Sequence, residues 1–296
     1  MLLPLISFAA IASAIVVNKM VLQHLPLIFY VGLRTLISGC VLFLFARRRS
    51  HRFNVRYLRT DWVALVTVAL MTTLVPALLK AYGIKYLLTS KAAFIGSLDP
   101  FVTALYAYLL LGERLNKSKL LGIAIAFSGA LFLCFSTSPV EQTLPAFLIF
   151  SLPELAAFGA VALGRYGWIV AQQLLKRDRY TPMELNGVTM IISGACGLML
   201  SSLVEGSLSI APLMTPVIAL RVLYSIVVGN VFGFTAYALV LKRHTANFAS
   251  IAGFSTPIFI TVFGWLLLGE RVTLPVMVAG MIIFAGVYLF YREERA

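Results

Sequence analysis

Long apolar runs follow one another along this chain of 296 residues, separated only by short clusters of charged residues. A helix that crosses a bilayer needs about 20 consecutive apolar residues, and the runs have about that length. Only 12% of the residues are charged and 60% are hydrophobic, which is too little polar side chain to cover a soluble domain. The sequence therefore predicts an all-α membrane protein with short connections.

Dividing the chain at its charged clusters predicts ten transmembrane helices. They cover residues 2–22, 27–46, 62–79, 87–110, 118–136, 145–170, 183–204, 216–240, 247–268 and 273–291. Connections rich in Lys and Arg stay on the cytoplasmic side. With the N-terminus inside, the inner connections and the tail hold 16 of the 24 Lys and Arg residues, and the outer connections hold 3. We therefore expect both termini to be cytoplasmic and the protein to lie in the inner (cytoplasmic) membrane.

The chain also contains an internal repeat. The sequence Leu-Leu-Leu-Gly-Glu-Arg at residues 109–114 recurs at residues 266–271, a shift of 157 positions. The same shift relates three further pairs: Gly96 and Gly253, Pro100 and Pro257, and Gly129 and Gly286. The repeat unit is five spans, an odd number, so residues 1–138 and 139–296 should form two inverted five-helix halves. Inverted repeats are typical of secondary transporters that work by alternating access.

The duplicated pattern of proline, Leu-Gly-Glu-Arg and glycine resembles the EamA-type ten-helix transporters of the drug/metabolite transporter superfamily. Pro26 followed by Arg34 at the start of the second span is similar to that family too. The resemblance implies a carrier of small metabolites in which export is favoured, because relatives of this type export amino acids, nucleobases and other metabolites. Some of them import, including relatives that take up nucleoside-like cofactors.

Two acidic residues fall well inside the predicted spans. An ionised carboxylate in hydrocarbon costs on the order of 3 kcal/mol or more, so it faces a cavity or a partner. Asp99 and Glu154 are therefore predicted to bind substrate or to carry a coupling proton. The alternatives are an ion pair between Asp99 and Lys91 and a shallow Glu154 that reaches outward. Pro100 and Pro257 are predicted to bend their helices and to give the two halves matched hinges.

Basic residues within the spans predict an anion-binding site. Arg34 and Lys91 are expected to meet the anionic group of the substrate, and Arg165 is expected at an inner gate or in an ion pair. A net-positive vestibule favours an anionic or zwitterionic substrate. The alternative is that several of these side chains reach to lipid headgroups. Three further basic residues lie toward the outer half: Lys19, Lys80 and Arg221.

Tyrosines and one asparagine complete the predicted substrate-binding residues. Tyr82, Tyr224 and Tyr237 offer rings for stacking and hydroxyls that need partners. Asn230 lies inside the eighth span within a Gly-x-x-x-Gly pattern, which permits close helix approach. For Asn230 the alternative is packing with a hydrogen bond between helices, and for the tyrosines it is a structural or lipid-facing position.

No sequence motif of an enzyme active site, a phosphate-binding loop or a metal site is present, so we predict neither an enzyme nor a bound cofactor or metal. Glu113 and Glu270 are better explained as helix ends with interfacial ion pairs. The predicted function is secondary active transport of an amino-acid-like or other zwitterionic or anionic metabolite. The alternatives are import of a nucleoside-like or cofactor-type metabolite, a lipid-linked-substrate flippase, and export of lipophilic cations. The expected partners are a small-molecule metabolite, membrane lipids and coupling protons, with no nucleic acid, in a monomer or a homodimer.

Overall fold

The computed structural model describes residues 2–49, 55–111, 116–133, 143, 145–147, 150–177, 179–206, 211–233 and 255–292. Before residue 134 the elements are α1 (Leu2–Leu22), α2 (Leu27–Arg49), α3 (Val55–Thr60), α4 (Trp62–Val68), the π-helix η1 (Ala69–Leu74), α5 (Val75–Tyr86), α6 (Thr89–Gly96), α7 (Asp99–Leu111) and α8 (Lys117–Leu133). After it come β1 (Ala146–Phe147), β2 (Phe150–Ser151), α9 (Leu152–Lys176), α10 (Pro182–Val204), the 3₁₀-helix η3 (Ala211–Met214), α11 (Pro216–Tyr224), the π-helix η4 (Ser225–Phe232), α14 (Ser255–Leu268) and α15 (Leu274–Arg292).

Two predicted spans differ from the observed helices, one at Pro100 and one at the start of α9. The predicted span 87–110 is divided into α6 and α7. Pro100 is the second residue of α7, where its missing N–H needs no helical partner. The predicted span 145–170 starts too early, because α9 begins only at Leu152. Ser151 and Glu154 form a capping box there, and a capping box starts a helix. Residues 146–147 and 150–151 instead form two short antiparallel strands, β1 and β2.

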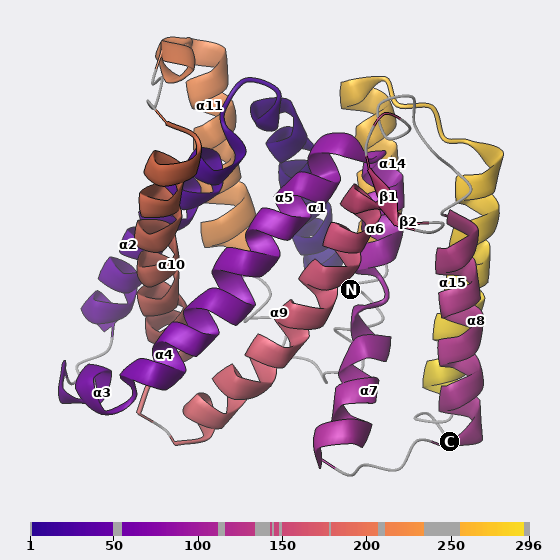
Figure 1. Ribbon diagram of the computed structural model, residues 1–296, viewed down its shortest axis with the longest axis horizontal. Coiled ribbons are helices and arrows are strands. Elements are labelled where there is room, and N and C mark those ends of the chain that lie inside the picture. The colour runs from indigo at the N-terminus through magenta and orange to yellow at the C-terminus, as the bar shows by residue number, and fades with distance from the viewer. Residues whose placement is uncertain are drawn as a thin grey trace.

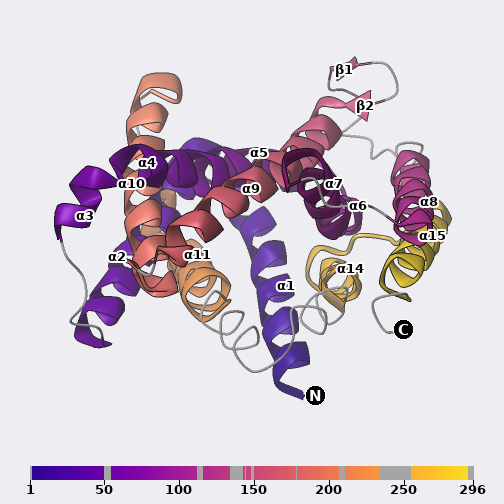
Figure 2. The ribbon, with the colours of Figure 1, turned by 90° about the horizontal axis from the view of Figure 1, so that it is seen from below.

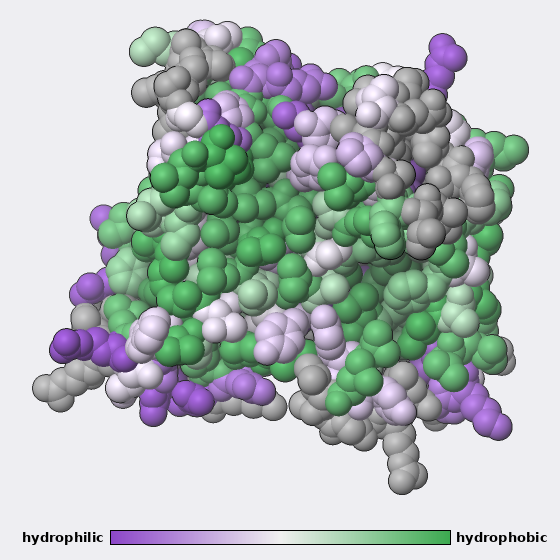
Figure 3. Space-filling model, viewed as in Figure 1, coloured by the Kyte–Doolittle hydropathy of each residue, from purple (hydrophilic) through white to green (hydrophobic). Residues whose placement is uncertain are grey.

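Apolar helices dominate the described part of the chain. Three continuous helical stretches are long and apolar enough to cross a membrane: Leu27–Arg48, Trp62–Tyr86 and Pro182–Val204. The third predicted span therefore extends beyond residue 79. Shorter apolar helices cover Phe8–Leu22, Pro216–Phe232, Ser255–Leu268 and Leu274–Phe290. Figure 3 shows a broad apolar band across one face, with hydrophilic residues gathered toward its upper and lower margins, as expected for an all-α membrane protein.

Closely packed helix pairs stand at the two ends of the molecule. α2 packs along α10 at one end, and α8 packs along α15 at the other, with the remaining long helices between them (Figures 1 and 2). Small residues allow such approach between membrane helices, where no hydrophobic force drives association. In the α2/α10 pair, glycines of each helix face the backbone of the other: Gly32, Gly39, Gly187, Gly194 and Gly197.

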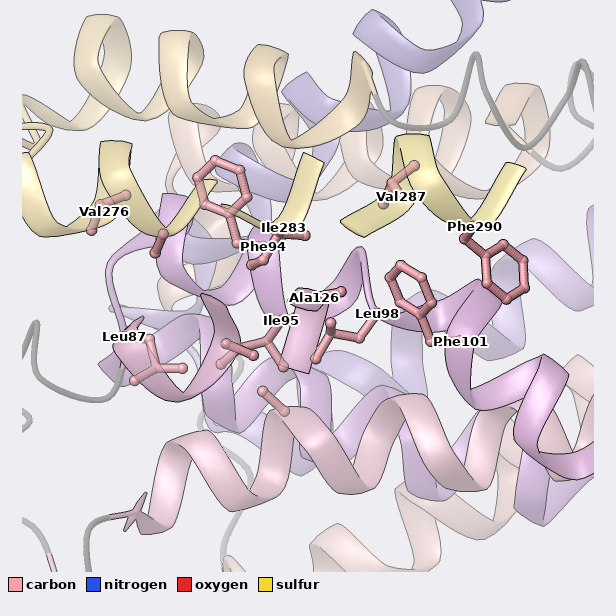
Figure 4. Packing of buried hydrophobic residues seen from close by; sticks show 13 residues of the cluster. Leu87, Phe94, Ile95, Leu98, Phe101, Ala126, Val276, Ile283, Val287 and Phe290 are labelled. Carbon is pink, nitrogen blue, oxygen red and sulfur yellow. The ribbon is translucent and has the colours of Figure 1, made fainter. Parts of the chain in front are cut away.

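The α8/α15 pair uses glycines that the repeat relates. A Cβ atom on Gly129 would press on the backbone oxygen of Ala279, and one on Gly286 would press on that of Gly122. A shift of 157 turns the first of these contacts into the second, so the two contacts are counterparts. Figure 4 shows the apolar cluster beside this pair, where Phe94, Leu98 and Phe101 lie with side chains of α15.

The two π-helices occupy equivalent positions as well. The shift of 157 carries η1 onto residues 226–231, which lie within η4. π-helical turns are rare and are frequent at functional sites. Ser193 of α10 donates a hydrogen bond of 2.7 Å to the backbone oxygen of Ala69 in η1, so a neighbouring helix satisfies a backbone group at this irregularity.

The close approach at Gly286 generates a stability prediction. We expect Gly286→Ala to destabilise the protein by about 1–3 kcal/mol, the usual effect of overpacking, because the new Cβ would lie 2.6 Å from the backbone nitrogen of Ala126. Thermal unfolding in detergent measures this. The control is Gly96→Ala, whose Cβ meets nothing within 4 Å. Equal unfolding midpoints for the two variants would contradict the close approach.

Candidate functional site

Helix α1 lies inside the protein. It packs against α14, η4, α11, α5 and α2, and Figure 2 shows it between the two end pairs. No side chain from Phe8 to Leu22 is exposed. The polar side chains of this stretch of α1 are therefore largely enclosed by other parts of the protein.

Lys91 and Glu154 form a buried ion pair. Lys91 Nζ lies 2.6 Å from Glu154 Oε1, and the two side chains are 0% and 1% exposed. The other carboxylate oxygen of Glu154 accepts a hydrogen bond from the backbone N–H of Ser151. The prediction that Glu154 lies well inside its span is wrong, because Glu154 is the third residue of α9. In this conformation neither member of the pair is open to a ligand.

Asp99 pairs with Arg165, for which an inner gate or an ion pair was predicted, whereas Lys91, the alternative partner considered for Asp99, pairs with Glu154. Arg165 Nε donates a hydrogen bond of 2.5 Å to Asp99 Oδ1, and the guanidinium also contacts the second carboxylate oxygen. Arg165 lies near the middle of α9, yet the two side chains are 31% and 32% exposed. Hydrocarbon solvates charge poorly, so we expect an accessible ion pair on a membrane helix to face water or a ligand.

Lys80 lies near Arg165 of this pair and near Arg34, and neither Lys80 nor Arg34 has a carboxylate partner among the described residues. The Arg34 guanidinium carbon is 5.5 Å above the ring of Tyr30, and its buried Nε has no hydrogen-bond partner. Lys80 is near enough to Arg34 and Arg165 to be repelled by both. Among the residues that the structure describes, no ion pair is formed by Arg34 or Lys80. Lys80 thus lies near two other cations, of which one, Arg165, is paired with Asp99.

Lys19 belongs to a separate polar cluster at the end of α1. Its Nζ lies 2.6 Å from Glu270 Oε1 and donates a hydrogen bond to the backbone oxygen of Leu87. Glu270 Oε2 accepts hydrogen bonds from the backbone N–H and the hydroxyl of Thr89. Glu270 therefore forms the ion pair expected at a helix end, and its partner comes from α1.

The predicted aromatic and amide residues are dispersed. Tyr82 packs edge-on against Tyr86 with ring centroids 4.9 Å apart. The Tyr224 hydroxyl is 2.8 Å from the hydroxyl of Ser13 on α1. Asn230 is buried and donates a hydrogen bond of 2.9 Å to Ser38 Oγ on α2, which is the interhelical bond considered as its alternative role. Tyr237 lies outside the described residues.

The two predicted hinge prolines differ in what the structure shows. Pro100 stands at the break between α6 and α7, which agrees with a bend at that point. Pro257 is the third residue of α14, and residues 234–254 before that helix are not among the described residues. A hinge at Pro257 therefore stays a prediction.

Sequence reasoning missed a buried carboxylate between two connections. Asp61 accepts hydrogen bonds of 3.1 Å from Arg177 and 3.2 Å from Arg179, and Tyr180 also donates to it. Burial, together with the Asp61 carboxylate, raises the pKa of Tyr180 to about 12, so its hydroxyl stays protonated and can donate. The sequence could have predicted this contact. Asp61 is the only acid in the predicted connection 47–61, and Arg177 and Arg179 lie in another connection that is predicted on the same side of the membrane.

Glu205 was missed for a different reason. Its carboxylate accepts the backbone N–H groups of Ile28 and Phe29, so the end of α10 caps the start of α2. Free N–H groups at a helix start attract an acceptor. Its role depends on the antiparallel packing of the two helices, which local sequence does not reveal.

Comparison with models of protein families identifies the family of this chain. The model of the EamA-like transporter family matches residues 1–135 and 152–292. The chain belongs to the EamA-like transporter family. This confirms the resemblance seen in the repeated motif, and it identifies a membrane transporter of the drug/metabolite transporter superfamily and not an enzyme.

Similar proteins cover nearly the whole of this EamA-like chain. It is 28% identical to an S-adenosylmethionine/S-adenosylhomocysteine transporter of Chlamydia trachomatis serovar L2, over 96% of this chain and 86% of that protein. It is 22% identical to the uncharacterized transporter YoaV of Bacillus subtilis, over 93% and 90% of the two chains. One crystal structure shares the fold, with a TM-score of 0.68 and 17% identity over 99% and 97% of the chains.

The buried pair predicts a specific stability pattern. Lys91→Met leaves Glu154 buried without its cation, which should cost about 3–5 kcal/mol. Adding Glu154→Gln removes the stranded charge and keeps a capping-box side chain, so the double variant should regain much of the loss. Thermal unfolding in detergent measures both. The control is Lys85→Met, because Lys85 is only half-buried and lies over the ring of Tyr86. A Lys91→Met effect no larger than that of the control would contradict the buried pair.

Proposed function

We propose that this EamA-like protein is a secondary active transporter of a zwitterionic adenosyl amino acid, of the S-adenosylmethionine or S-adenosylhomocysteine class. The observation that carries the proposal is a group of cations beside the Asp99–Arg165 pair: Lys80 lies near Arg165 and Arg34, and neither Lys80 nor Arg34 has a carboxylate partner among the described residues. The ligand class comes from the relatives of that name, which align along 96% of this chain.

The chemistry of such a ligand fits the site. Its amino-acid end carries a carboxylate, and guanidinium and ammonium groups bind carboxylates through charge-assisted hydrogen bonds. Its ammonium group needs an acceptor, which Asp99 offers. The sulfonium of S-adenosylmethionine adds a positive charge that S-adenosylhomocysteine lacks. Because cations outnumber carboxylates in the site, the uncharged thioether is expected to bind more tightly than the sulfonium.

Transport by this chain is proposed to follow alternating access between two inverted halves, residues 1–138 and 139–296. Helix packing supports that division. α1 packs on η4 and α14, while α9 packs on η1 and α7, and the shift of 157 relates these partners. Ten membrane crossings with both termini in the cytoplasm, in a bacterial-type cytoplasmic membrane, complete the proposed topology.

Ligand binding tests the proposal directly. We expect S-adenosylhomocysteine to raise the unfolding midpoint of the purified protein, and methionine or adenosine alone to need at least about tenfold higher concentrations. Arg34→Ala and Lys80→Ala should each weaken binding by roughly 10-fold to 100-fold, because each removes a charge-assisted bond worth about 1.5–3 kcal/mol. Lys85→Ala, on the same helix as Lys80, is the control.

Each outcome of this binding experiment has a meaning. Tight binding of methionine without the nucleoside would replace the proposal by a carrier of plain amino acids. No binding of any of these compounds by the wild type would overturn it, as would Arg34 and Lys80 variants that bind like the control.

Proton coupling is proposed to depend on Asp99, which pairs with Arg165 where the two side chains are accessible. In liposomes, Asp99→Asn should abolish the stimulation of uptake by a pH gradient while exchange of labelled ligand continues. The double variant Lys91→Met/Glu154→Gln should leave that stimulation intact, since it removes the buried pair without stranding either charge. If both variants keep the full pH dependence, the coupling proposal fails and facilitated exchange replaces it.

A further inference from the structure

Three polar side chains meet where α1, α2 and η4 come together. The hydroxyls of Tyr30 and Ser225 both lie within hydrogen-bond distance of Asn18 Oδ1, and they are 2.8 Å from each other. Tyr30 and Ser225 are almost completely buried. A buried hydroxyl needs a partner, and Asn18 Oδ1 is the acceptor that serves both.

This contact fixes the orientation of the Asn18 amide. Because Oδ1 points into the junction of the three helices, Nδ2 on the same carbon points out of it. Asn18 is half-buried, and within the described part of the chain its hydrogen bonds are formed by Oδ1 and not by Nδ2. The amide nitrogen therefore has an accessible surface and two N–H donors to offer.

The accessible amide faces the inside of the protein. Asn18 lies on the stretch of α1 that has no exposed side chain. Tyr30, which holds the amide through its hydroxyl, also carries the Arg34 guanidinium 5.5 Å above its ring. One tyrosine thus positions an amide donor and a cation that has no carboxylate partner.

We propose that Asn18 is a further substrate-recognition residue, whose Nδ2 donates a hydrogen bond to the carboxylate that Arg34 binds. Tyr30 and Ser225 are positioning residues that keep the amide turned toward the ligand. This inference rests on the proposed function, because the carboxylate belongs to the adenosyl amino acid.

The test compares two ligands on the full-length protein in detergent. S-adenosylhomocysteine carries the carboxylate, and 5′-methylthioadenosine keeps the nucleoside and thioether without it. Asn18→Asp places a negative charge beside the carboxylate, so we expect binding of S-adenosylhomocysteine to fall by about 100-fold and binding of methylthioadenosine to change less than about threefold. Asn18→Leu should weaken the first ligand by about tenfold.

The control variant is Asn230→Leu. It also removes an asparagine that bonds between helices, but the amide nitrogen of Asn230 is already bonded to Ser38. Unfolding midpoints without ligand report the structural cost of each change. Ser225→Ala should weaken S-adenosylhomocysteine less than Asn18→Leu does, because it loosens the amide without removing it.

The outcomes separate this inference from the proposed function. If the wild type does not bind S-adenosylhomocysteine, the proposed function fails and takes this inference with it. If the wild type binds, but Asn18→Asp weakens both ligands equally or neither, the role of Asn18 is structural and the inference alone is overturned.

Discussion

A charge inside an apolar medium must find an opposite charge or water, and the polar interior of this protein is arranged by that requirement. Lys91 and Glu154 satisfy it by complete mutual burial. Asp99 and Arg165 satisfy it with about a third of each side chain accessible. Arg34 and Lys80 have no described carboxylate, so water or a bound anion must meet their need. The candidate binding site is the place where the protein leaves this charge uncompensated.

The ion pairs also connect the two proposed halves. Lys19 with Glu270, Lys91 with Glu154, Asp99 with Arg165, and Asp61 with Arg177 each join a residue before position 138 to one after position 139. A motion of one half against the other must therefore break or stretch some of these pairs. The fully buried pair is costly to separate, whereas water can replace the partners in the accessible pair. Separating Asp99 from Arg165 should therefore cost less free energy than separating Lys91 from Glu154.

The sequence predicted features that depend on one segment or on the repeat, and it failed where a partner had to be chosen across helices. Apolar runs located the helices, and Gly129 with Gly286 marked a real pair of close contacts. The capping-box residues Ser151 and Glu154 indicate the start of α9. The prediction placed that start at residue 145 because the apolar run begins there. Lys91 was only an alternative partner for Asp99, and the packing of α7 on α9, which local sequence does not reveal, brings Arg165 to it instead.

The uncompensated cations also imply different roles for the two ends of the proposed ligand. A nucleoside alone is neutral and would leave Arg34 and Lys80 without an anion. Its binding would also remove water from these two cations, which costs free energy. The amino-acid carboxylate removes that penalty, so it should supply most of the affinity. The nucleoside then contributes selectivity through contacts that do not depend on charge. A carrier built in this way would bind free nucleosides more weakly than the adenosyl amino acid, because its own cations would remain unpaired.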